Sequence, residues 1–294
     1  MLDDLPTLTE TVRHYNLAAD KSLGQHFLLD QNVTDKIARY AAPLGGVSVA
    51  EIGPGPGGLT RSLIRGGAEH VLAIEMDERF LPALADIGRA SKNENGDDRL
   101  RVYKGNGLKV DISQELSAPI KIVSNLPYNV GTKMLINWLT ATPIFWQQMV
   151  LMFQKEVAER VVAKAGDNHY GRLAILAQSV ADTQIVFDVP ARAFTPPPRV
   201  DSAVVLLNPL PDGQRFEDLD TLGKITHAAF IMRRKMLRRS LKPFAKKHNI
   251  DLTAWLETAQ IQPEARPETL SVDDFHRLTR EFKRLNATHP TQAT

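Results

Sequence analysis

Short runs of apolar and β-branched residues alternate with longer, helix-like segments through the first two thirds of this chain. The runs are residues 47–52, 70–74, 101–103, 120–123 and 149–153. Each run suits one buried strand, and the segments between them suit crossover connections. Such alternation is typical of consecutive βαβ units. The sequence therefore predicts an α/β fold around a mostly parallel sheet.

Two later runs complete the predicted sheet and mark where it ends. Residues 184–189 and 203–207 are separated by a turn-rich stretch, and they suit an antiparallel pair at one end of a seven-stranded sheet. Residues 209–213 read as a linker, and the residues beyond them have little β-branched content. We expect a domain order of N-terminal arm (1–20), α/β domain (21–208), small all-α domain (214–286) and disordered tail (287–294).

Composition limits the environment in which the protein works. The chain contains no cysteine, which excludes disulfides and thiolate metal sites. Its first residues lack the apolar core of a secretory signal, and no stretch approaches the roughly 18 apolar residues of a membrane span. No apolar stripe is left over for a second subunit. We therefore expect a cytoplasmic monomer that uses no membrane and no metal.

A glycine-rich loop follows the first predicted strand and opens a helix near Leu59. Gly53, Gly55 and Gly58 satisfy the spacing of a dinucleotide fingerprint, and glycine lets the backbone approach a ligand closely. Glu75 ends the next strand, where a carboxylate can accept hydrogen bonds from both hydroxyls of a ribose. Loop and acid together predict an adenosine-bearing cofactor, but they do not separate NAD from S-adenosylmethionine.

The tetrad Asn125-Leu126-Pro127-Tyr128 comes directly after another predicted strand. Ligands of open α/β sheets bind at strand ends of this kind. The Asn125 carboxamide and a backbone carbonyl can both accept hydrogen bonds from one exocyclic amine, while the Tyr128 ring stacks on the base that carries it. This pattern indicates methylation of an amino group on a flipped-out base. The alternative is a proline turn with an asparagine cap and a half-buried tyrosine.

Positive charge is concentrated in one short segment. Residues 233–247, here called the basic block, carry eight Lys or Arg and no acid, whereas the rest of the chain has 28 basic against 34 acidic residues. Because so many close cations repel one another, a polyanionic partner explains the block better than a solvated face does. The candidate RNA-binding residues are Arg233, Arg234, Lys235, Arg238, Arg239 and Lys242.

Six segments, in this order, resemble the ribosomal RNA adenine dimethyltransferases: residues 21–28, 51–57, 74–77, 125–128, 170–173 and 194–204. The resemblance implies a Rossmann-like, S-adenosylmethionine-dependent methyltransferase domain with a small helical C-terminal domain. It also implies transfer of two methyl groups to N6 of each of two adjacent adenosines near the 3′ end of small-subunit (16S) rRNA. The substrate would be the small ribosomal subunit or its assembly intermediate, with a role in small-subunit biogenesis.

The resemblance also assigns site residues. The family's cofactor contacts fall on His26, Leu28, Gly53, Glu75, Asn106 and Asn125, to which the loop adds Gly55. The family usually has Asp at the position of Asn106 and most often Asn at that of His26, so we expect cofactor binding with altered affinity. The catalytic set is Asn125, Leu126, Pro127, Tyr128 and Phe194. By resemblance, Phe194 stacks on the face of the target adenine opposite Tyr128.

Three other functions remain open at this point. A Rossmann oxidoreductase that binds NAD would explain the glycine loop and Glu75, but neither the tetrad nor the basic block. A non-catalytic rRNA-binding assembly factor of the same fold would not need the intact tetrad. A resistance-type enzyme acting on large-subunit rRNA is a third alternative, and residues 170–173 and 194–198 favour the small-subunit branch by resemblance.

Overall fold

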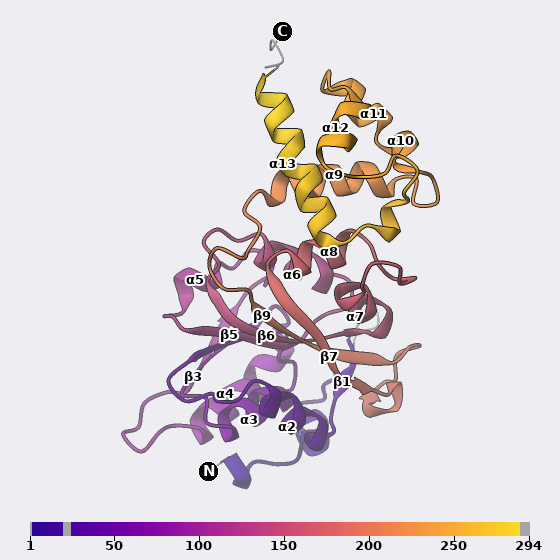
Figure 1. Ribbon diagram of the computed structural model, residues 1–294. Coiled ribbons are helices and arrows are strands. Elements are labelled where there is room, and N and C mark those ends of the chain that lie inside the picture. The colour runs from indigo at the N-terminus through magenta and orange to yellow at the C-terminus, as the bar shows by residue number, and fades with distance from the viewer. Residues whose placement is uncertain (1, 20–24, 289–294) are drawn as a thin grey trace. The chain divides into compact units, whose positions relative to one another are not determined.

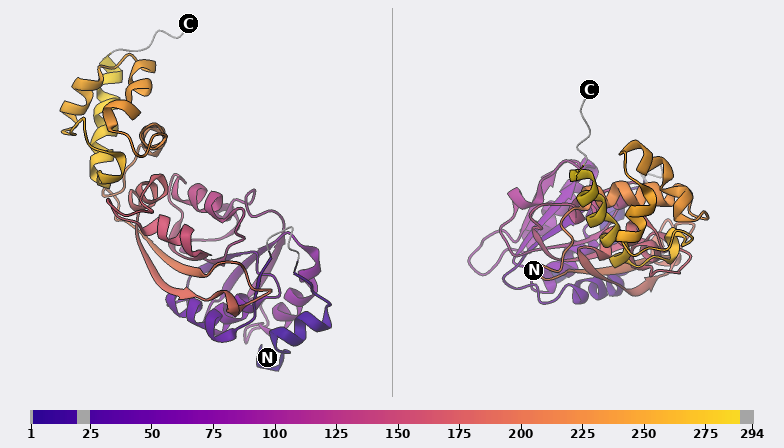
Figure 2. Two further views of the ribbon diagram at one scale, coloured as in Figure 1. Left: turned by 90° about the vertical axis from the view of Figure 1, so that its right-hand side faces the viewer. Right: turned by 45° about the horizontal axis from the view of Figure 1, so that its top comes forward.

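The structure is a computed structural model that describes residues 2–19 and 25–288. The chain folds into two compact units (Figures 1 and 2). The first comprises Met1–Ala158 and Thr183–Pro209, and the second comprises Glu159–Asp182 and Leu210–Thr294. In the part of the chain that the structure describes, no helix combines the length and the hydropathy needed to cross a membrane.

A seven-stranded sheet in the order β4-β3-β2-β5-β6-β9-β7 forms the centre of the first unit. Its strands are β2 (Ser48–Ile52), β3 (His70–Glu75), β4 (Leu100–Lys104), β5 (Ile120–Asn125), β6 (Trp146–Gln154), β7 (Ala181–Val189) and β9 (Ser202–Pro209). Every neighbouring pair from β4 to β6 is parallel, and β9 runs antiparallel to β6. The prediction of a mostly parallel, seven-stranded sheet is confirmed.

Helices cover both faces of this sheet. The helices α2 (Gln31–Tyr40), α3 (Gly58–Arg65) and α4 (Leu81–Ala90) lie on one face, and α6 (Gly131–Leu139) lies on the other (Figure 1). Because side chains alternate along a strand, Val49 and Val71 point toward the first face, where they pack in one cluster with Leu63 and Leu84. The apolar runs in the sequence are therefore strands that are buried on both sides.

The N-terminal arm has regular structure of its own. It contains η1 (Leu2–Asp4) and α1 (Leu8–His14), and a capping box between Thr7 and Glu10 begins α1. The buried Arg61 of α3 donates to the Pro6 carbonyl at 2.6 Å and to Thr11 Oγ1 at 3.1 Å. These bonds attach the arm to the α/β unit.

A second, two-stranded sheet joins distant parts of the first unit. Its strands, β1 (Phe27–Leu28) and β8 (Phe194–Thr195), pair antiparallel with Leu28 opposite Phe194. Nothing in the sequence pattern indicates this pairing, which brings the segment after the N-terminal arm beside the turn-rich stretch 194–198.

The second unit is helical. Its helices include α8 (Arg172–Gln178), α9 (Leu219–Phe230), α10 (Leu237–Ser240), α11 (Lys242–Lys247), α12 (Leu252–Thr258) and α13 (Val272–Thr288), and α7 (Lys155–Val162) leads into it from the first unit. Its core is built around the fully buried Trp255 and Phe275.

Two predicted boundaries differ from the structure. The sequence places residues 159–182 in the α/β domain, but they group with the helical unit because Tyr170 and Ile175 are buried in its core. The sequence also predicts a disordered tail from residue 287, yet α13 continues to Thr288. The remainder of that prediction, residues 289–294, lies outside the described residues, as do residues 21–24 of the first motif.

Candidate active site

One pocket at the carboxyl ends of β2, β3 and β5 collects most of the predicted site. Its lining includes His26, Gly53, Gly55, Glu75, Asn106, Asn125, Leu126, Pro127 and Tyr128. A neighbouring pocket is lined by Leu28 and Glu51 and again by His26, Gly53, Gly55 and Asn125. The structure therefore brings together all of the predicted cofactor contacts and four of the five predicted catalytic residues.

The glycine loop is shaped for close contact with a ligand. Gly53 and Gly55 have φ angles of +68° and +55°, in the left-handed region that favours glycine. A Cβ atom added to Gly53 would lie 3.5 Å from the Pro127 ring, whereas one added to Gly55 would meet nothing within 4 Å. The space beside Gly55 is open, and it can receive the cofactor.

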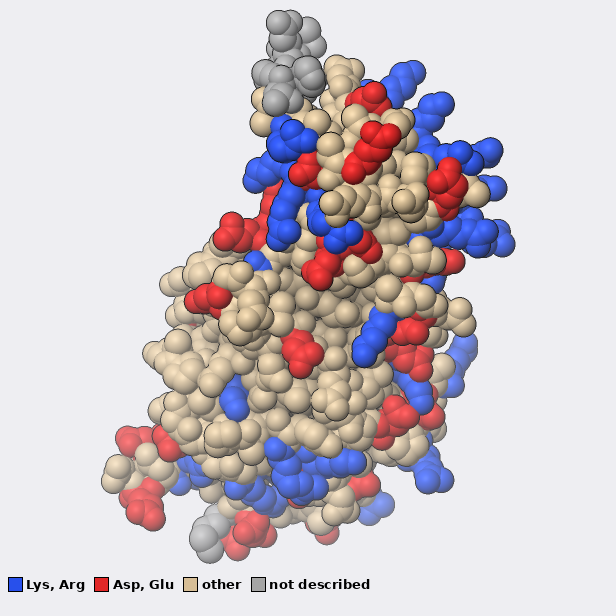
Figure 3. Space-filling view, viewed as in Figure 1, with Lys and Arg blue, Asp and Glu red and all other residues tan. Residues whose placement is uncertain are grey.

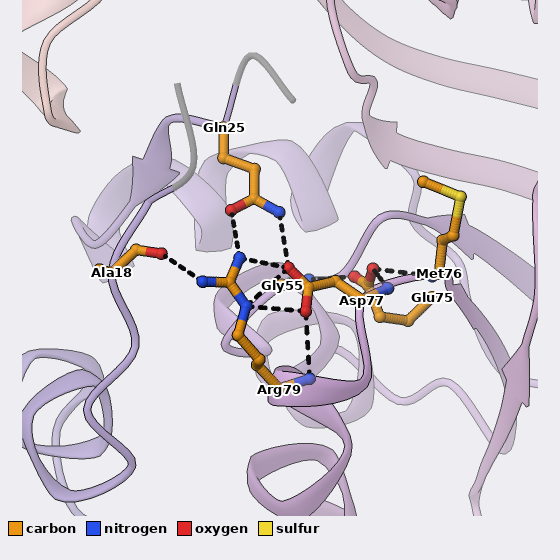
Figure 4. A network of polar contacts seen from close by, with 7 residues as sticks. All are labelled: Ala18, Gln25, Gly55, Glu75, Met76, Asp77 and Arg79. Carbon is orange, nitrogen blue, oxygen red and sulfur yellow. Dashed lines mark hydrogen bonds and ion pairs between the residues drawn. The ribbon is translucent and has the colours of Figure 1, made fainter. Parts of the chain in front are cut away.

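The Glu75 carboxylate accepts hydrogen bonds from three backbone N–H groups (Figure 4). Its Oε1 accepts hydrogen bonds from the N–H groups of Met76 and Asp77, both at 2.8 Å, and its Oε2 accepts from Gly55. Burial raises the pKa of Glu75, and the backbone hydrogen bonds partly oppose this shift. The Glu75 carboxylate is thus fixed in the pocket wall, and its remaining lone pairs can accept hydrogen bonds from the hydroxyl groups of a ribose.

A clamp of three polar side chains lies next to Glu75 (Figure 4). Arg79 donates to both carboxylate oxygens of Asp77 and to the Ala18 carbonyl, and Gln25 donates to Asp77 at 3.0 Å. The hydrogen bond from Arg79 lowers the pKa of Asp77 to about 2, with a smaller contribution from Gln25. The sequence pattern does not predict this clamp, although Gln25 belongs to the motif 21–28 and Asp77 to the motif 74–77.

Asn106 lies in the same pocket, after β4. Its Oδ1 accepts a hydrogen bond from the Leu108 N–H at 2.9 Å, which stabilises the turn. An oxygen with a second lone pair can still accept from an adenine amino group. The departure from Asp therefore preserves the acceptor while removing its charge.

The tetrad connects the end of β5 to the turn that precedes α6, and all four of its residues line the pocket. Pro127 O accepts from the N–H groups of Val130 and Gly131, at 3.2 and 2.9 Å, so the chain turns into α6 at that point. Among the described residues, no backbone N–H donates to the Leu126 carbonyl. Asn125, the last residue of β5, is only partly buried. The Asn125 carboxamide and the Leu126 carbonyl are therefore both available to accept hydrogen bonds from an exocyclic amine.

The rings of Tyr128 and His26 lie close together in the pocket wall, with centroids 5.7 Å apart and planes tilted by 32°. The Tyr128 hydroxyl is 2.8 Å from Ser202 Oγ, and burial raises the pKa of this tyrosine. His26 Nδ1 is 2.7 Å from the Pro196 carbonyl, which can only accept, so Nδ1 carries the proton. This contact gives His26 a structural role alongside its place in the cofactor pocket.

Phe194 does not join the other predicted catalytic residues. Its side chain is 2% exposed and packs in the core cluster of the first unit. The β1–β8 pairing holds it there, opposite Leu28. The expected stacking of Phe194 on the target base does not agree with this structure, since the ring faces the core.

Glu51 is a buried acid beside the site. It is 2% exposed, lines the pocket next to Leu28, and accepts a hydrogen bond from Thr60 Oγ1 at 2.6 Å. Its pKa is raised to about 8, mainly by burial; the hydrogen bond from Thr60 opposes this shift, and the nearby charge of Glu75 adds to it. Among the described residues, no group of three or more His, Cys, Asp and Glu side chains could hold a metal ion.

The basic block is not one helix, and its cations are not equivalent. It spans the end of the α9–α10 connection, α10 and α11, where Lys and Arg side chains gather on the helical unit (Figure 3). Arg233 pairs with Glu268 at 3.0 Å, and Arg238 pairs with Glu264 at 3.2 Å. The other four candidates make no ion pair with any described residue: Arg234, Lys235, Arg239 and Lys242. Those four are best placed to meet a polyanion.

Comparison with known proteins decides the family. The model of the ribosomal RNA adenine dimethylase family matches residues 16–284, which is most of the chain. This chain belongs to that family. As a ribosomal RNA adenine dimethylase it is an enzyme that uses S-adenosylmethionine. The oxidoreductase and the non-catalytic assembly factor find no support in these matches.

Individual relatives agree with the family. A ribosomal RNA small subunit methyltransferase A from Maricaulis maris is 49% identical over 284 residues, which covers 96% of each chain. Its counterpart from a Ruegeria species is 50% identical over 285 residues, covering 96% of this chain and 99% of the relative. The crystal structure of a Plasmodium falciparum dimethyladenosine transferase matches with a TM-score of 0.74 at 27% identity, covering 88% and 98% of the two chains.

Proposed function

We propose that this ribosomal RNA adenine dimethylase methylates N6 of two adjacent adenosines near the 3′ end of 16S rRNA. The small subunit or its assembly intermediate would be the substrate, in the cytoplasm, and the reaction would contribute to small-subunit biogenesis. The names of the bacterial relatives support the choice of subunit. One observation supports the chemistry: Asn125, which ends β5, and Leu126, which follows it, both line the pocket that contains Glu75.

The residues of the pocket fit S-adenosylmethionine, which supplies an electrophilic methyl group on a good leaving group. Glu75 would accept hydrogen bonds from its ribose hydroxyls, and Asn106 would accept from its adenine amino group. The backbone of Gly53 and Gly55 would lie against it, and His26 and Leu28, which line the same region, would also contact it. Once ionised, the buried carboxyl group of Glu51 would suit the cationic end of the methionine moiety.

The chain activates the target amine by accepting its protons in hydrogen bonds. The lone pair of an adenine N6 is delocalised into the ring and is a poor nucleophile. Two acceptors, Asn125 Oδ1 and the Leu126 carbonyl, favour a more tetrahedral nitrogen whose lone pair points away from the ring. Catalysis then consists mainly of positioning and electrostatics, and it needs no covalent intermediate with the protein.

Tyr128 holds the extruded base. Its ring lines the pocket next to the two acceptors, and stacking of a base on an aromatic ring is worth about 1–3 kcal/mol. The fixed ring of Pro127 keeps the turn in shape. We assign the stacking to Tyr128 alone, because Phe194 is buried in the core.

The basic block would bind the rRNA backbone through its cations that lack ion pairs. Such contacts select shape and phosphate positions, so the choice of adenosine must come from the fold of the RNA. The enzyme would act as a monomer. The test of this function is methyl transfer to isolated small and large ribosomal subunits that lack the modification, compared side by side.

A further inference from the structure

Tyr128 is held at its hydroxyl end by a residue outside the tetrad. The two hydroxyl oxygens of Tyr128 and Ser202 lie 2.8 Å apart. Ser202 is the first residue of β9 and is completely buried, whereas the Tyr128 ring is half-buried and lines the pocket. The hydrogen bond therefore joins a wall of the pocket to a strand of the central sheet.

The sheet gives Ser202 a fixed position relative to the reacting groups. In the antiparallel pairing of β9 with β6, Ser202 lies opposite Gln154. In the parallel pairing of β6 with β5, Asn125 lies opposite Met152. Strand ladders thus fix both Ser202 and Asn125, and Tyr128, which follows Asn125 after two residues, contacts Ser202 through its hydroxyl. The Ser202 bond determines where the tyrosine ring stands relative to the Asn125 carboxamide.

The same segment also supports the neighbouring ring. The Pro196 carbonyl accepts from the Nδ1 of His26 at 2.7 Å, and Pro196 lies in the connection that leads from β8 to Ser202, the first residue of β9. His26 and Tyr128 are therefore both tied to residues 196–202. Two supported rings side by side give the pocket a preformed aromatic wall.

We propose that Ser202 is a positioning residue for methyl transfer, because its hydrogen bond holds the hydroxyl end, and with it the long axis, of the Tyr128 ring on which the target adenine stacks. Without that bond the ring has other staggered positions available. Ordering it when the RNA arrives would then reduce the binding energy available for orienting the amine. The inference rests on the stacking role of Tyr128 in the proposed function.

The test compares four single variants and one double variant in methyl transfer to undermethylated ribosomal subunits. Ser202→Ala should lower kcat/KM for the RNA by roughly 3- to 10-fold, as expected for one lost hydrogen bond, with the Kd for S-adenosylmethionine unchanged. Tyr128→Phe should give the same loss. The double variant should be no worse than either single variant, since both remove the same bond. Ser202→Thr, which keeps the hydroxyl, should restore most of the activity.

Ser91→Ala is the matched control. Ser91 is also a buried serine of the first unit, but its hydroxyl donates to the Gly88 carbonyl in the last turn of α4. It should leave kcat/KM unchanged.

Wild-type kcat/KM in Ser202→Ala would overturn the proposal. So would losses that multiply in the double variant, or an equal fall in cofactor affinity. If Ser202→Ala does not fold, Tyr128→Phe still tests the proposal, because this variant removes the same hydrogen bond and deletes only a hydroxyl group. Both ribosomal subunits are assayed, so methylation confined to the large subunit would refute the proposed target while the variants still test Ser202.

Discussion

The backbone N–H of Gly55 donates to the Oε2 of Glu75 at 3.1 Å. This bond connects the glycine loop after β2 to the acid at the end of β3. The loop itself thereby holds Glu75 in one orientation. Preorganisation of this kind reduces the free-energy cost of ordering side chains on binding.

Replacing Glu75 with Gln should weaken binding of S-adenosylmethionine by roughly 10- to 100-fold. Hydrogen bonds to a charged group are worth about 1.5–3 kcal/mol, and the new NH₂ group would face backbone N–H donors. Isothermal titration calorimetry would measure the Kd. Glu78→Gln is the control, since Glu78 is an exposed acid on the following turn that pairs with Lys104. Equal affinities for both variants would remove Glu75 from the cofactor site.

Asn125→Ala should lower the methyl-transfer rate by roughly 10²–10³, by analogy with the loss of one oxyanion-hole partner. Cofactor affinity should fall less, because most cofactor contacts come from other residues. Single-turnover assays with saturating cofactor would measure the rate. Asn137→Ala, on the exposed side of α6, should behave like the wild type. Near-normal turnover of Asn125→Ala would contradict the activation mechanism.

Glu51 should make the stability of the cofactor-free protein depend on pH. Its pKa rises from 4.5 to about 8 in the folded protein, mainly through burial. Between these values the folded state keeps the proton and the unfolded state loses it. The contribution of Glu51 to stability is therefore complete below pH 4.5 and is lost as the pH rises to about 8.

Denaturant unfolding of the wild type and of Glu51→Gln across this pH range would check the prediction. The amide can still accept the hydrogen bond from Thr60 but cannot ionise, so the variant should lack this part of the decline. Parallel stability curves for the two proteins would show that Glu51 is ionised in the folded state.

Cations of the basic block without ion pairs should control the salt dependence of RNA binding. Arg234→Ala or Arg239→Ala should each flatten the plot of log K against log salt by about 0.9 if the lost contact was to a duplex phosphate. Arg284→Ala is the control, because Arg284 lies on α13 and pairs with Glu281 at 2.8 Å. An unchanged slope in both basic-block variants would mean that this surface does not bind RNA.

Local patterns were enough to predict much of the fold and the cofactor pocket. The β2 run, its glycine loop and Glu75 are close in sequence, and parallel strands bring their carboxyl ends to one edge. The position of the tetrad could be predicted in the same way, because Asn125 ends β5, the strand that pairs with β2. These residues came together because their positions depend mainly on strand order.

Contacts between distant segments could not be predicted in the same way. Phe194 is buried because β8 pairs with β1, and a proline-rich stretch gives no sign of that partner. The sequence does not distinguish Arg233 and Arg238 from the other cations of the basic block. Their ion-pair partners, Glu268 and Glu264, come from another part of the helical unit. Residues 159–182 joined the helices because their apolar side chains fit that core. Each outcome depends on tertiary packing, which a sequence pattern does not specify.

The most direct test of the proposed reaction is methyl transfer from labelled S-adenosylmethionine to small ribosomal subunits that lack the modification, followed by nucleoside analysis of the rRNA. We predict N6,N6-dimethyladenosine in 16S rRNA at two adjacent positions near its 3′ end. Large subunits should accept no label, and Asn125→Ala should produce little product in the same time. Absence of dimethyladenosine from the small-subunit rRNA, with the cofactor and the subunit both bound, would refute the proposed reaction.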